Sequence, residues 1–416
     1  MDINKAFHPF DIRGNYPEVV DEQMASLIGQ YVRSYLDGQI IIASDNRESS
    51  PKLRHALGVG VDLGELPTPL FYYAVCKLGS TGGIMVTASH VYSAQNGFKI
   101  VHANALPFNE GEILELKTFV ERHSGKAEGR IQNPQERIPD SAGMTTLYIS
   151  EIVQRFKGLR CNKKIIFDSG QTVATPIIKE ILSRLSLNYE LLTTNRGLNP
   201  LIEEGYKNVC EAVIREKADL GVLWDGDCDR VVFIDKTGKL IPQSYILGII
   251  AKNYKKAAFD MRAGLAAYTT DYILTPSWAQ NLKYAMQDDP KIGFAGEVSG
   301  HLIFREWYGI DDGIFGALKF IELMGDLDIK SDYIDIIEEN FEYKSDPALV
   351  LDKIANYYRS KDFLVSVLDG VTVSTGEFHL NIRQSLTEPF LRLNLEARTQ
   401  KKLDEIQNEI KTLIGS

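Results

Sequence analysis

Short runs of β-branched and other apolar residues alternate with helix-forming stretches along most of the chain, and this alternation constrains the fold most. Helix TPIIKEILSRL (175–185) places its isoleucines and leucines on one face, with Pro176 suited to the first turn. Strands that alternate with helices predict an α/β fold, in which ligands gather at the carboxyl ends of strands. Four runs that end in polar or glycine-containing loops predict buried strands: GGIMVTAS (82–89), KKIIFDSG (163–170), DLGVLWDGD (219–227) and RVVFID (230–235).

The last seventy residues or so have a different pattern. Residues 368–397 predict successive strands, and a helix with Leu403, Ile406, Ile410 and Leu413 on one face follows. This order predicts a smaller α+β domain. Three preceding stretches of roughly 100 residues, a common domain size, could be repeats of one α/β unit. The expected domains are 1–142, 143–238, 239–345 and 346–416.

Charge and cysteine content exclude several functional classes. The net charge of −10 argues against a nucleic-acid or membrane partner, so any anionic ligand must be held by local groups. None of the four cysteines forms a CxxC pair, which argues against a zinc knuckle and a disulfide framework. The first residues carry no apolar signal region and no apolar run reaches transmembrane length. We therefore expect a cytoplasmic protein.

The string DGDCDR contains the most informative cluster. Asp225, Asp227 and Asp229 alternate on a turn with Gly226, so their carboxylates can converge on a hard divalent cation. Arg230 adds a planar cation suited to phosphate. The alternative is a solvated acidic turn between two strands. The order of glycine and acidic residues excludes an EF-hand.

Two further loops carry groups for sugar and phosphate. In GEVSGH, Glu297, Ser299 and His301 can bind sugar hydroxyls, and the histidine can move a proton near neutral pH. The alternative is a surface turn. RQSLTEP and the arginine after it predict a phosphate cradle without a P-loop lysine, the alternative being an ordinary β-turn. The cradle residues are Arg383, Ser385, Thr387 and Arg392.

The stretch TASHVYSAQNGFK contains the candidate nucleophile, Ser89. It lacks the G-x-S-x-G elbow of hydrolases, and we expect that adjacent Ser89 and His90 do not easily face each other as nucleophile and base. Lys99 follows an Asn-Gly pair typical of a turn, and Arg13 lies in FDIRG. A serine supplied with these cations and a divalent metal suits phosphoryl transfer, which needs positive charge and alignment more than a strong base.

The chain resembles the α-D-phosphohexomutases, most closely the bacterial phosphomannomutase/phosphoglucomutase branch. The motifs occur in family order over nearly the whole chain: FDIRG, DNRESSP, PTP, TASH…NGFK, DGDCDR, GEVSGH, DDGI and RQSLTEP…LRLNLEA. The resemblance implies three related mixed α/β domains and a small C-terminal α+β domain around a central cleft. It also implies an isomerase that acts as an intramolecular phosphotransferase.

The resemblance implies a specific reaction and a role for each candidate site residue. A phosphoserine at Ser89 would convert hexose 1-phosphate to 6-phosphate, of mannose or glucose, through a 1,6-bisphosphate intermediate. Mg²⁺ would be held by Ser89, Asp225, Asp227 and Asp229. Arg13, His90 and Lys99 would lie by the transferring group, and His301 could assist proton transfer. Glu297 and Ser299 would bind hydroxyls, while Arg230 and the cradle residues would bind phosphate.

Departures from the family pattern keep alternatives open. Val91 and Tyr92 stand where the family usually has Asn-Pro, and Trp278-Ala279 where a Gly-His pair is expected. These motivate a catalytically impaired phosphosugar-binding homologue. Val298 in GEVSGH leans toward mannose or glucose, with a phosphoglucosamine mutase as the alternative. A metal-dependent phosphatase is the last alternative. Both a monomer and a dimer fit the sequence.

Overall fold

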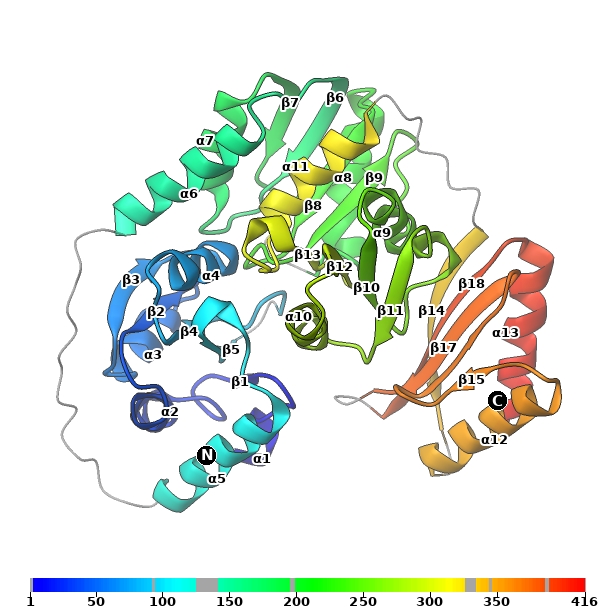
Figure 1. The fold of residues 1–416 in the computed structure, drawn as a ribbon, viewed down its shortest axis with the longest axis horizontal. Coiled ribbons are helices and arrows are strands. Elements are labelled where there is room, and N and C mark those ends of the chain that lie inside the picture. Colours follow the sequence, from blue (N-terminus) through cyan, green and yellow to red (C-terminus); the bar gives the residue numbers. More distant parts are fainter. Residues whose placement is uncertain are drawn as a thin grey trace. The chain divides into compact units, whose positions relative to one another are not determined.

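The computed structural model describes residues 3–91, 94–124, 141–194, 199–325, 334–343, 346–385 and 389–415. The chain forms two compact units (Figure 1). The first unit contains Met1–Leu240 and His301–Asp326, and the second contains Ile241–Gly300 and Leu327–Ser416. The chain therefore crosses from one unit to the other within the GEVSGH loop, between Gly300 and His301.

The first sheet of the first unit has the strand order β1-β5-β4-β2-β3. Strand β2 runs parallel to β3 and β4, whereas β5 runs antiparallel to β4 and β1. Its strands are β1 (Ile12–Asn15), β2 (Ile40–Ser44), β3 (Val61–Glu65), β4 (Gly82–Val86) and β5 (Gln95–His102). Its helices are α1 (Ile3–Ala6), α2 (Glu22–Tyr35), α3 (Ser50–Ala56), α4 (Thr68–Lys77) and α5 (Glu110–His123).

The Asn-Gly pair before Lys99 lies inside β5, so the expectation of a turn there is wrong. Gly97 pairs with Arg13 on β1, and a Cβ at Gly97 would lie 2.1 Å from the carbonyl oxygen of Ile12. The Asn96 amide donates to the hydroxyls of Ser49 and Ser50 at 2.8 and 2.9 Å. Close strand pairing and these long-range bonds override the local turn preference.

The second sheet repeats the order of four strands of the first, β3-β2-β4-β5. Its order is β7-β6-β8-β9, with β6 parallel to β7 and β8 and with β9 antiparallel to β8. The strands are β6 (Cys161–Asp168), β7 (Leu187–Leu192), β8 (Leu220–Trp224) and β9 (Val231–Asp235). Helices α6 (Ser141–Arg155), α7 (Thr175–Arg184), α8 (Glu203–Arg215) and α11 (Gly313–Met324) and strand β13 (Leu302–Phe304) complete the unit. The four predicted strands and the helix at 175–185 are confirmed.

The second unit contains a third parallel arrangement, β11-β10-β12. It consists of β10 (Lys256–Asp260), β11 (Asp271–Thr275) and β12 (Phe294–Gly296), with helices α9 (Gln243–Ala251) and α10 (Ala279–Asp288). In all three sheets the first parallel strand in the chain lies between the second and the third. This shared order supports three related α/β units.

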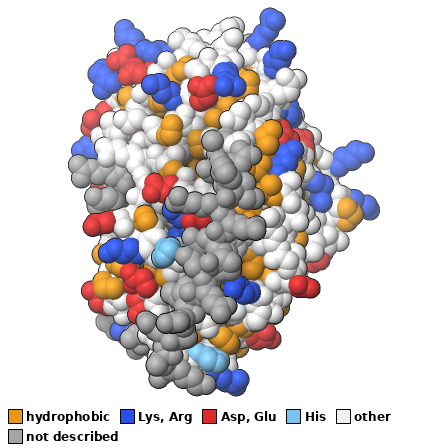
Figure 2. Space-filling model, turned by 90° about the vertical axis from the view of Figure 1, so that its left-hand side faces the viewer, with side chains coloured by type: hydrophobic (Ala, Val, Ile, Leu, Met, Phe, Trp, Pro, Cys, Tyr) orange, Lys and Arg blue, Asp and Glu red, His pale blue; other side chains and the backbone are white. Residues whose placement is uncertain are grey.

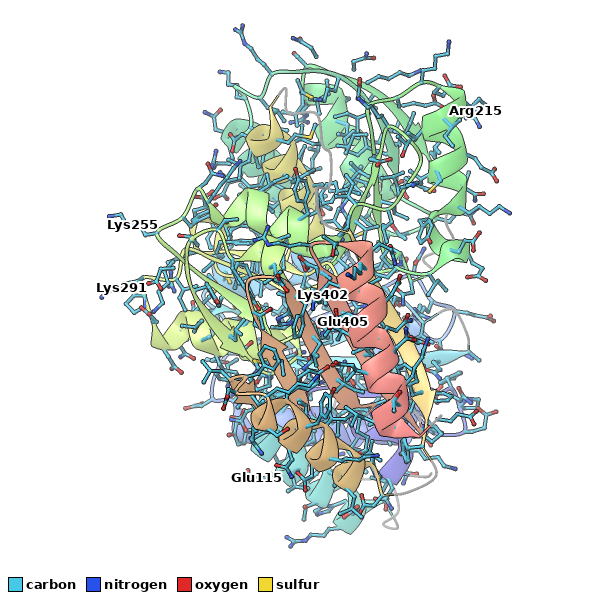
Figure 3. The ribbon with its side chains drawn as sticks, turned by 90° about the vertical axis from the view of Figure 1, so that its right-hand side faces the viewer. Glu115, Arg215, Lys255, Lys291, Lys402 and Glu405 are labelled. Atoms are coloured by element: carbon cyan, nitrogen blue, oxygen red, sulfur yellow. The ribbon has the colours of Figure 1, made fainter. Side chains whose placement is uncertain are left out.

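The C-terminal strands of the second unit form an antiparallel sheet of order β14-β18-β17-β16-β15. They are β14 (Ile334–Glu342), β15 (Val365–Ser366), β16 (Val371–Ser374), β17 (Phe378–Gln384) and β18 (Phe390–Ala397). Helices α12 (Pro347–Ser360) and α13 (Gln400–Ile414) pack on it. On α13, Lys402 and Glu405 form a 2.8 Å ion pair on the outer face (Figure 3). Strand β14 lies within the range 239–345 expected for the third domain, yet it pairs with β18.

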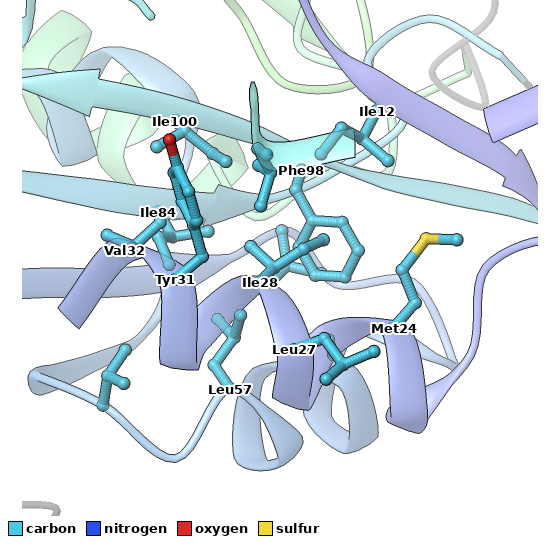
Figure 4. Close-up of a cluster of buried hydrophobic side chains, with 14 of the residues drawn as sticks. Ile12, Met24, Leu27, Ile28, Tyr31, Val32, Leu57, Ile84, Phe98 and Ile100 are labelled. Atoms are coloured by element: carbon cyan, nitrogen blue, oxygen red, sulfur yellow. The ribbon is translucent and has the colours of Figure 1, made fainter. Parts of the chain in front are cut away.

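Helix α2 shows how sequence produces packing in the first unit. Asp21 caps it by accepting from Met24 N–H at 2.8 Å, and the apolar residues that follow recur at helical spacing. Leu27 and Ile28 face a cluster that includes Ile84 and Phe98 from the sheet (Figure 4). Burying each such side chain contributes about 1.5–3 kcal/mol, so this face fixes the helix on the sheet that carries Ser89.

Charges are mixed on the face of the molecule that Figure 2 shows. Acidic and basic side chains are interspersed on the face in Figure 2 rather than segregated. This distribution agrees with the expectation that anions are bound by local groups. No helix in the described part of the chain is long and apolar enough to cross a membrane.

Candidate active site

The Ser89 loop follows the carboxyl end of β4. Ser89 is buried, with a φ of 53°, and its N–H donates to Thr87 Oγ1 at 2.9 Å. The Arg47 guanidinium donates to the carbonyls of Ser89 and Val91, both at 2.7 Å, and to Asp45 Oδ2 at 2.9 Å. A left-handed non-glycine residue is strained, so these bonds hold the serine in an orientation that the loop would not choose alone. Tyr92 lies outside the described residues.

The metal loop, Asp225–Arg230, joins β8 to β9 in the second sheet. Asp225, Asp227 and Asp229 are almost fully buried, and one oxygen from each lies within 4.8 Å of the others. Asp225 Oδ2 lies 3.3 Å from Ser89 Oγ. The Oδ1 atoms of Asp227 and Asp229 have no hydrogen-bond partner among the described residues. This all-oxygen set fits a hard divalent cation. Because all three side chains are buried, the alternative of a solvated turn is excluded.

Two cations lie against the metal loop. Lys99 Nζ donates to Asp227 Oδ2 at 2.7 Å and to Asp229 Oδ2 at 2.5 Å. Although burial alone would lower it, these carboxylates raise the pKa of Lys99 well above its usual value. Arg13 forms an ion pair with Asp11. Burial opposes the charge, but Asp11, and after it Asp227 and Asp229, raise the pKa of Arg13. Both cations stay charged.

The carboxylates differ in their electrostatic environment. Burial, followed by repulsion from Asp229 and Asp227, raises the pKa of Asp225 well above its usual range. Burial would also raise the pKa of Asp229, but Lys99 and His301 lower it. Together with Asp11, the three buried carboxylates outnumber the nearby cations Lys99, Arg13 and Arg230, and a divalent cation would balance the excess negative charge.

Ser89 and His90 do face each other, so the expectation that adjacent residues could not is wrong. Ser89 Oγ lies 3.3 Å from His90 Nδ1, because the left-handed backbone at Ser89 turns both side chains to one side. Arg230 foremost, then burial and Arg13, hold the pKa of His90 well below its usual value. The ring is neutral and lies beside the hydroxyl.

His301 joins this site from the other side of the metal loop. It forms a β-bridge with Arg230, whose Nε–H donates to His301 Nε2 at 3.0 Å. Since a guanidinium only donates, Nε2 carries no proton and the neutral ring holds its proton on Nδ1. Nδ1 lies 3.2 Å from Asp311 Oδ2 and 3.9 Å from Asp229 Oδ1.

Residues that follow His301 in the chain pack against the metal loop. Asp312 caps α11 by accepting from Ile314 and Phe315 N–H, both at 2.9 Å, and also accepts from Trp307 Nε1–H at 2.7 Å. Burial raises the pKa of Asp312 to about 6. Gly313 N–H donates to the Cys228 carbonyl at 3.1 Å, so the start of α11 packs directly on the metal loop.

The predicted sugar-binding residues Glu297 and Ser299 lie in the second unit, where β12 ends. Arg262, after β10, forms ion pairs with Glu297 and with Asp260. Although burial alone would lower it, Asp260 raises the pKa of Arg262. Ser299 Oγ is buried and has no hydrogen-bond partner among the described residues. Parallel strands β10 and β12 end at the same edge, which places these polar groups together.

The predicted phosphate cradle has two opposed arginines. Arg383 on β17 is directly opposite Arg392 on β18. Burial, and then repulsion from Arg262, lower the pKa of Arg383, and its Nε has no partner among the described residues. Like charges directly opposite each other are destabilising, so this pair favours an anion. Ser385 is buried at the end of β17, and Thr387 lies outside the described residues.

The structure thus gathers the predicted residues into two groups. Arg13, Ser89, His90, Lys99, the three metal-loop aspartates, Arg230 and His301 share the first unit, whereas Glu297, Ser299, Arg383, Ser385 and Arg392 share the second. Sequence reasoning missed Arg47, Thr68, Arg262 and Asp311. Thr68 begins α4 and donates its hydroxyl to Asp227 Oδ2 at 2.7 Å. Arg47, Thr68 and Asp311 stand in the strings DNRESSP, PTP and DDGI, which were already noted as part of the family pattern. Arg262 stands just after the end of β10.

Family models of the phosphoglucomutase/phosphomannomutase family match almost the whole chain. Domains I, II and III, each described as alpha/beta/alpha, match residues 4–126, 146–238 and 261–342, and the C-terminal domain matches 353–413.

Individual relatives match over nearly their whole length. The chain is 28% identical to "Phosphohexose mutases" of Xanthomonas campestris, with 97% of each chain covered. It is also 28% identical to "Phosphomannomutase/phosphoglucomutase" of Pseudomonas aeruginosa, covering 99% of this chain and 96% of the relative. A crystal structure of a phosphoglucomutase/phosphomannomutase family protein from Burkholderia thailandensis superposes with a TM-score of 0.80 at 22% identity, covering 98% and 96% of the two chains.

Proposed function

Since the chain belongs to the phosphoglucomutase/phosphomannomutase family and is a phosphohexomutase, we propose that it interconverts the 1- and 6-phosphates of mannose or glucose through a phosphoserine at Ser89. One observation carries the proposal: Ser89 Oγ lies 3.3 Å from Asp225 Oδ2, in the group of three converging aspartates. A serine beside a cluster of this charge suits phosphoryl transfer and not acyl transfer.

The residues fit Mg²⁺. Asp225, Asp227 and Asp229 supply oxygen ligands, and two of their buried oxygens are unpaired among the described residues. When bound there with a phosphoserine oxygen, Mg²⁺ would offset negative charge on the transferring phosphoryl group. Lys99 and Arg13 supply fixed positive charge at the same place, which lowers the cost of bringing an anionic substrate to a phosphoserine.

The first half of the reaction moves the phosphoryl group from the enzyme to the sugar. The 6-hydroxyl of a hexose 1-phosphate attacks phosphorus, and the bond between phosphorus and Ser89 Oγ breaks. The hydroxyl proton passes to a base, and Ser89 Oγ takes up a proton as it leaves. We assign this role to His301, whose Nε2 accepts from Arg230 in the free protein and becomes available to the hydroxyl when Arg230 turns to the substrate phosphate. The product is the 1,6-bisphosphate.

The second half regenerates the phosphoserine. After the bisphosphate reorients, Ser89 Oγ loses its proton and attacks the phosphorus of the 1-phosphate group. The bond from that phosphorus to the C1 oxygen breaks, the C1 oxygen takes up a proton, and hexose 6-phosphate remains. Glu297 and Ser299 bind sugar hydroxyls, and Arg230, Arg383, Ser385, Thr387 and Arg392 bind the non-reacting phosphate. Because the same groups must accept both orientations, hydrogen-bonding and charge recognition suit this role better than a shaped apolar pocket.

A coupled assay with intact mass measurement tests the proposal. Glucose, mannose and glucosamine 1-phosphates are supplied with Mg²⁺ and a trace of the 1,6-bisphosphate. We expect turnover of mannose or glucose phosphate and a phosphoryl mass on the wild type that Ser89→Ala lacks. Binding without turnover would instead indicate an impaired homologue. Preferred turnover of the glucosamine phosphate would indicate a phosphoglucosamine mutase, and phosphate release faster than isomerisation a phosphatase.

A further inference from the structure

The segment that carries Arg262 has few polar side chains of its own to hold it. It runs from Met261 to Tyr268, between β10 and β11, and reads MRAGLAAY. Within it, Tyr268 O–H donates to the Ala263 carbonyl at 2.6 Å, and buried side chains from elsewhere in the second unit also bind its backbone. His379 Nε2–H on β17 donates to the Met261 carbonyl at 3.0 Å. Ala266 N–H donates to Glu396 Oε1 on β18 at 2.9 Å.

The fit between Glu396 and this segment is close. A Cβ at Gly264 would lie 1.8 Å from Glu396 Oε2, so only glycine allows the approach. Gly264 N–H also donates to Ser244 Oγ on α9 at 2.9 Å. Burial raises the pKa of Glu396 and lowers that of His379 to about 4, so the histidine is neutral and suited to a carbonyl acceptor.

The same two strands carry the anion-binding arginines. His379 is directly opposite Glu396, and Arg383 is directly opposite Arg392 four residues further along β17. Alternate residues of a strand share a face, so both pairs project from one face of the sheet, with the Asn381–Asn394 pair between them. At about 3.4 Å per residue, the two pairs are roughly 14 Å apart along the strands. The β17–β18 ladder is therefore a rigid spacer between the arginine pair and the segment that carries Arg262.

We propose that His379 and Glu396 are positioning residues that fix Arg262 relative to the Arg383–Arg392 pair, so that the second unit recognises a phosphate and sugar hydroxyls at a set separation. Arg262 acts through its ion pair with Glu297. Burial, and then Arg262, lower the pKa of Arg383, so the two guanidinium groups interact. This inference rests on the proposed function, in which Glu297 binds sugar hydroxyls and the arginine pair binds phosphate.

Separate measurements of phosphate and phosphosugar binding test it. In His379→Ala, we expect the KM for the hexose phosphate to rise about tenfold, with kcat less affected. The Kd for inorganic phosphate, measured by calorimetry, stays unchanged because both arginines remain. His379→Gln, which keeps an Nε2 donor, restores the KM. His102→Ala is the matched control. It replaces a histidine that lies in the first unit, and we expect it to leave the KM unchanged.

A double-mutant cycle separates positioning from general loss of structure. If His379 acts through Arg262, His379→Ala adds nothing to the KM in an Arg262→Met background. Additive effects, an equal loss of inorganic phosphate affinity, or an unchanged KM in His379→Ala would each overturn the inference. Repeating the calorimetry with the hexose phosphate in a Ser89→Ala background keeps this test independent of turnover. A tenfold loss of binding there, without turnover in the wild type, would reject the proposed reaction and retain the inference.

Discussion

The ammonium group of Lys99 lies 2.7 Å from Asp227 Oδ2, joining a strand of the first sheet to the loop after a strand of the second. Lys99 is on β5, and its other contact is Asp229. Thr68 strengthens the same junction, since its N–H donates to the Asp227 carbonyl at 3.1 Å. Two sheets far apart in the sequence are thus connected through the groups proposed to hold metal and phosphate.

Replacing Lys99 by methionine should make folding depend on a divalent cation. Without the lysine, Asp227 and Asp229 would be buried without their cation, and breaking a buried ion pair costs about 3–5 kcal/mol. Mg²⁺ should then stabilise Lys99→Met more than it stabilises the wild type, because it supplies the missing charge. Urea unfolding with and without MgCl₂ measures both effects.

Lys164→Met is the matched control for Lys99→Met. Lys164 pairs with Glu216 at 2.9 Å on the surface, where loss of a pair costs about 0–1 kcal/mol. An equal Mg²⁺ response in Lys99→Met and the wild type would contradict the assignment of these aspartates as metal ligands.

Gly313→Ala should displace the metal loop. A Cβ at Gly313 would lie 2.7 Å from the carbonyl oxygens of both Cys228 and Arg230, which flank Asp229. Overpacking of this kind costs about 1–3 kcal/mol, and the shift should weaken Mg²⁺ binding measured by calorimetry. Gly158→Ala has open space around the new Cβ and should stay within about 0.5 kcal/mol of the wild type. Unchanged Mg²⁺ affinity in Gly313→Ala would show that α11 does not constrain the loop.

Local patterns predicted the fold because the residues of each strand and helix have the apolar spacing typical of that element. The strand at 82–86, the helix at 175–184 and the helix at 400–414 all lie within or beside the stretches expected to form them. Asn96 and Gly97 misled because their turn preference is local, whereas the pairing of β5 with β1 and the bonds to Ser49 and Ser50 are not.

The site was predictable where chemistry clusters in one string, as in DGDCDR. The site was less predictable where it is assembled from single residues that belong to several separate strings. Asp311 stood in the DDGI string without an assigned role, and only the Ile303–Asp311 bridge and the contact with His301 bring it to the site. Arg262 has no motif around it, and its role emerges from pairing with Glu297, 35 residues later.

Arg383→Met should separate stability from anion binding. Removing one of two directly opposed arginines relieves repulsion, so the free protein should lose no stability. The stabilisation by inorganic phosphate should be lost, because one of the two opposed cations is gone. Thermal unfolding in sodium phosphate and in sodium chloride of equal ionic strength makes the comparison. Arg359→Met on the exposed face of α12 should keep the phosphate effect. A full phosphate effect in Arg383→Met would move the anion site elsewhere.

His379 should make the stability of the chain depend on pH below neutrality. Burial lowers its pKa from 6.5 to about 4, so between these values the unfolded state binds more protons than the folded state. Stability is therefore full above pH 6.5 and falls as the pH drops to about 4, by up to ~3 kcal/mol for this one group. His379→Gln removes the titrating ring but keeps a donor for Met261, so its stability should fall less over this range and match the wild type at neutral pH. His379→Asn is too short to reach the carbonyl, and should lose the pH dependence together with stability at neutral pH. Urea unfolding of the three proteins across this range measures the difference, and an identical pH slope in His379→Gln and the wild type would contradict a buried neutral histidine at this position.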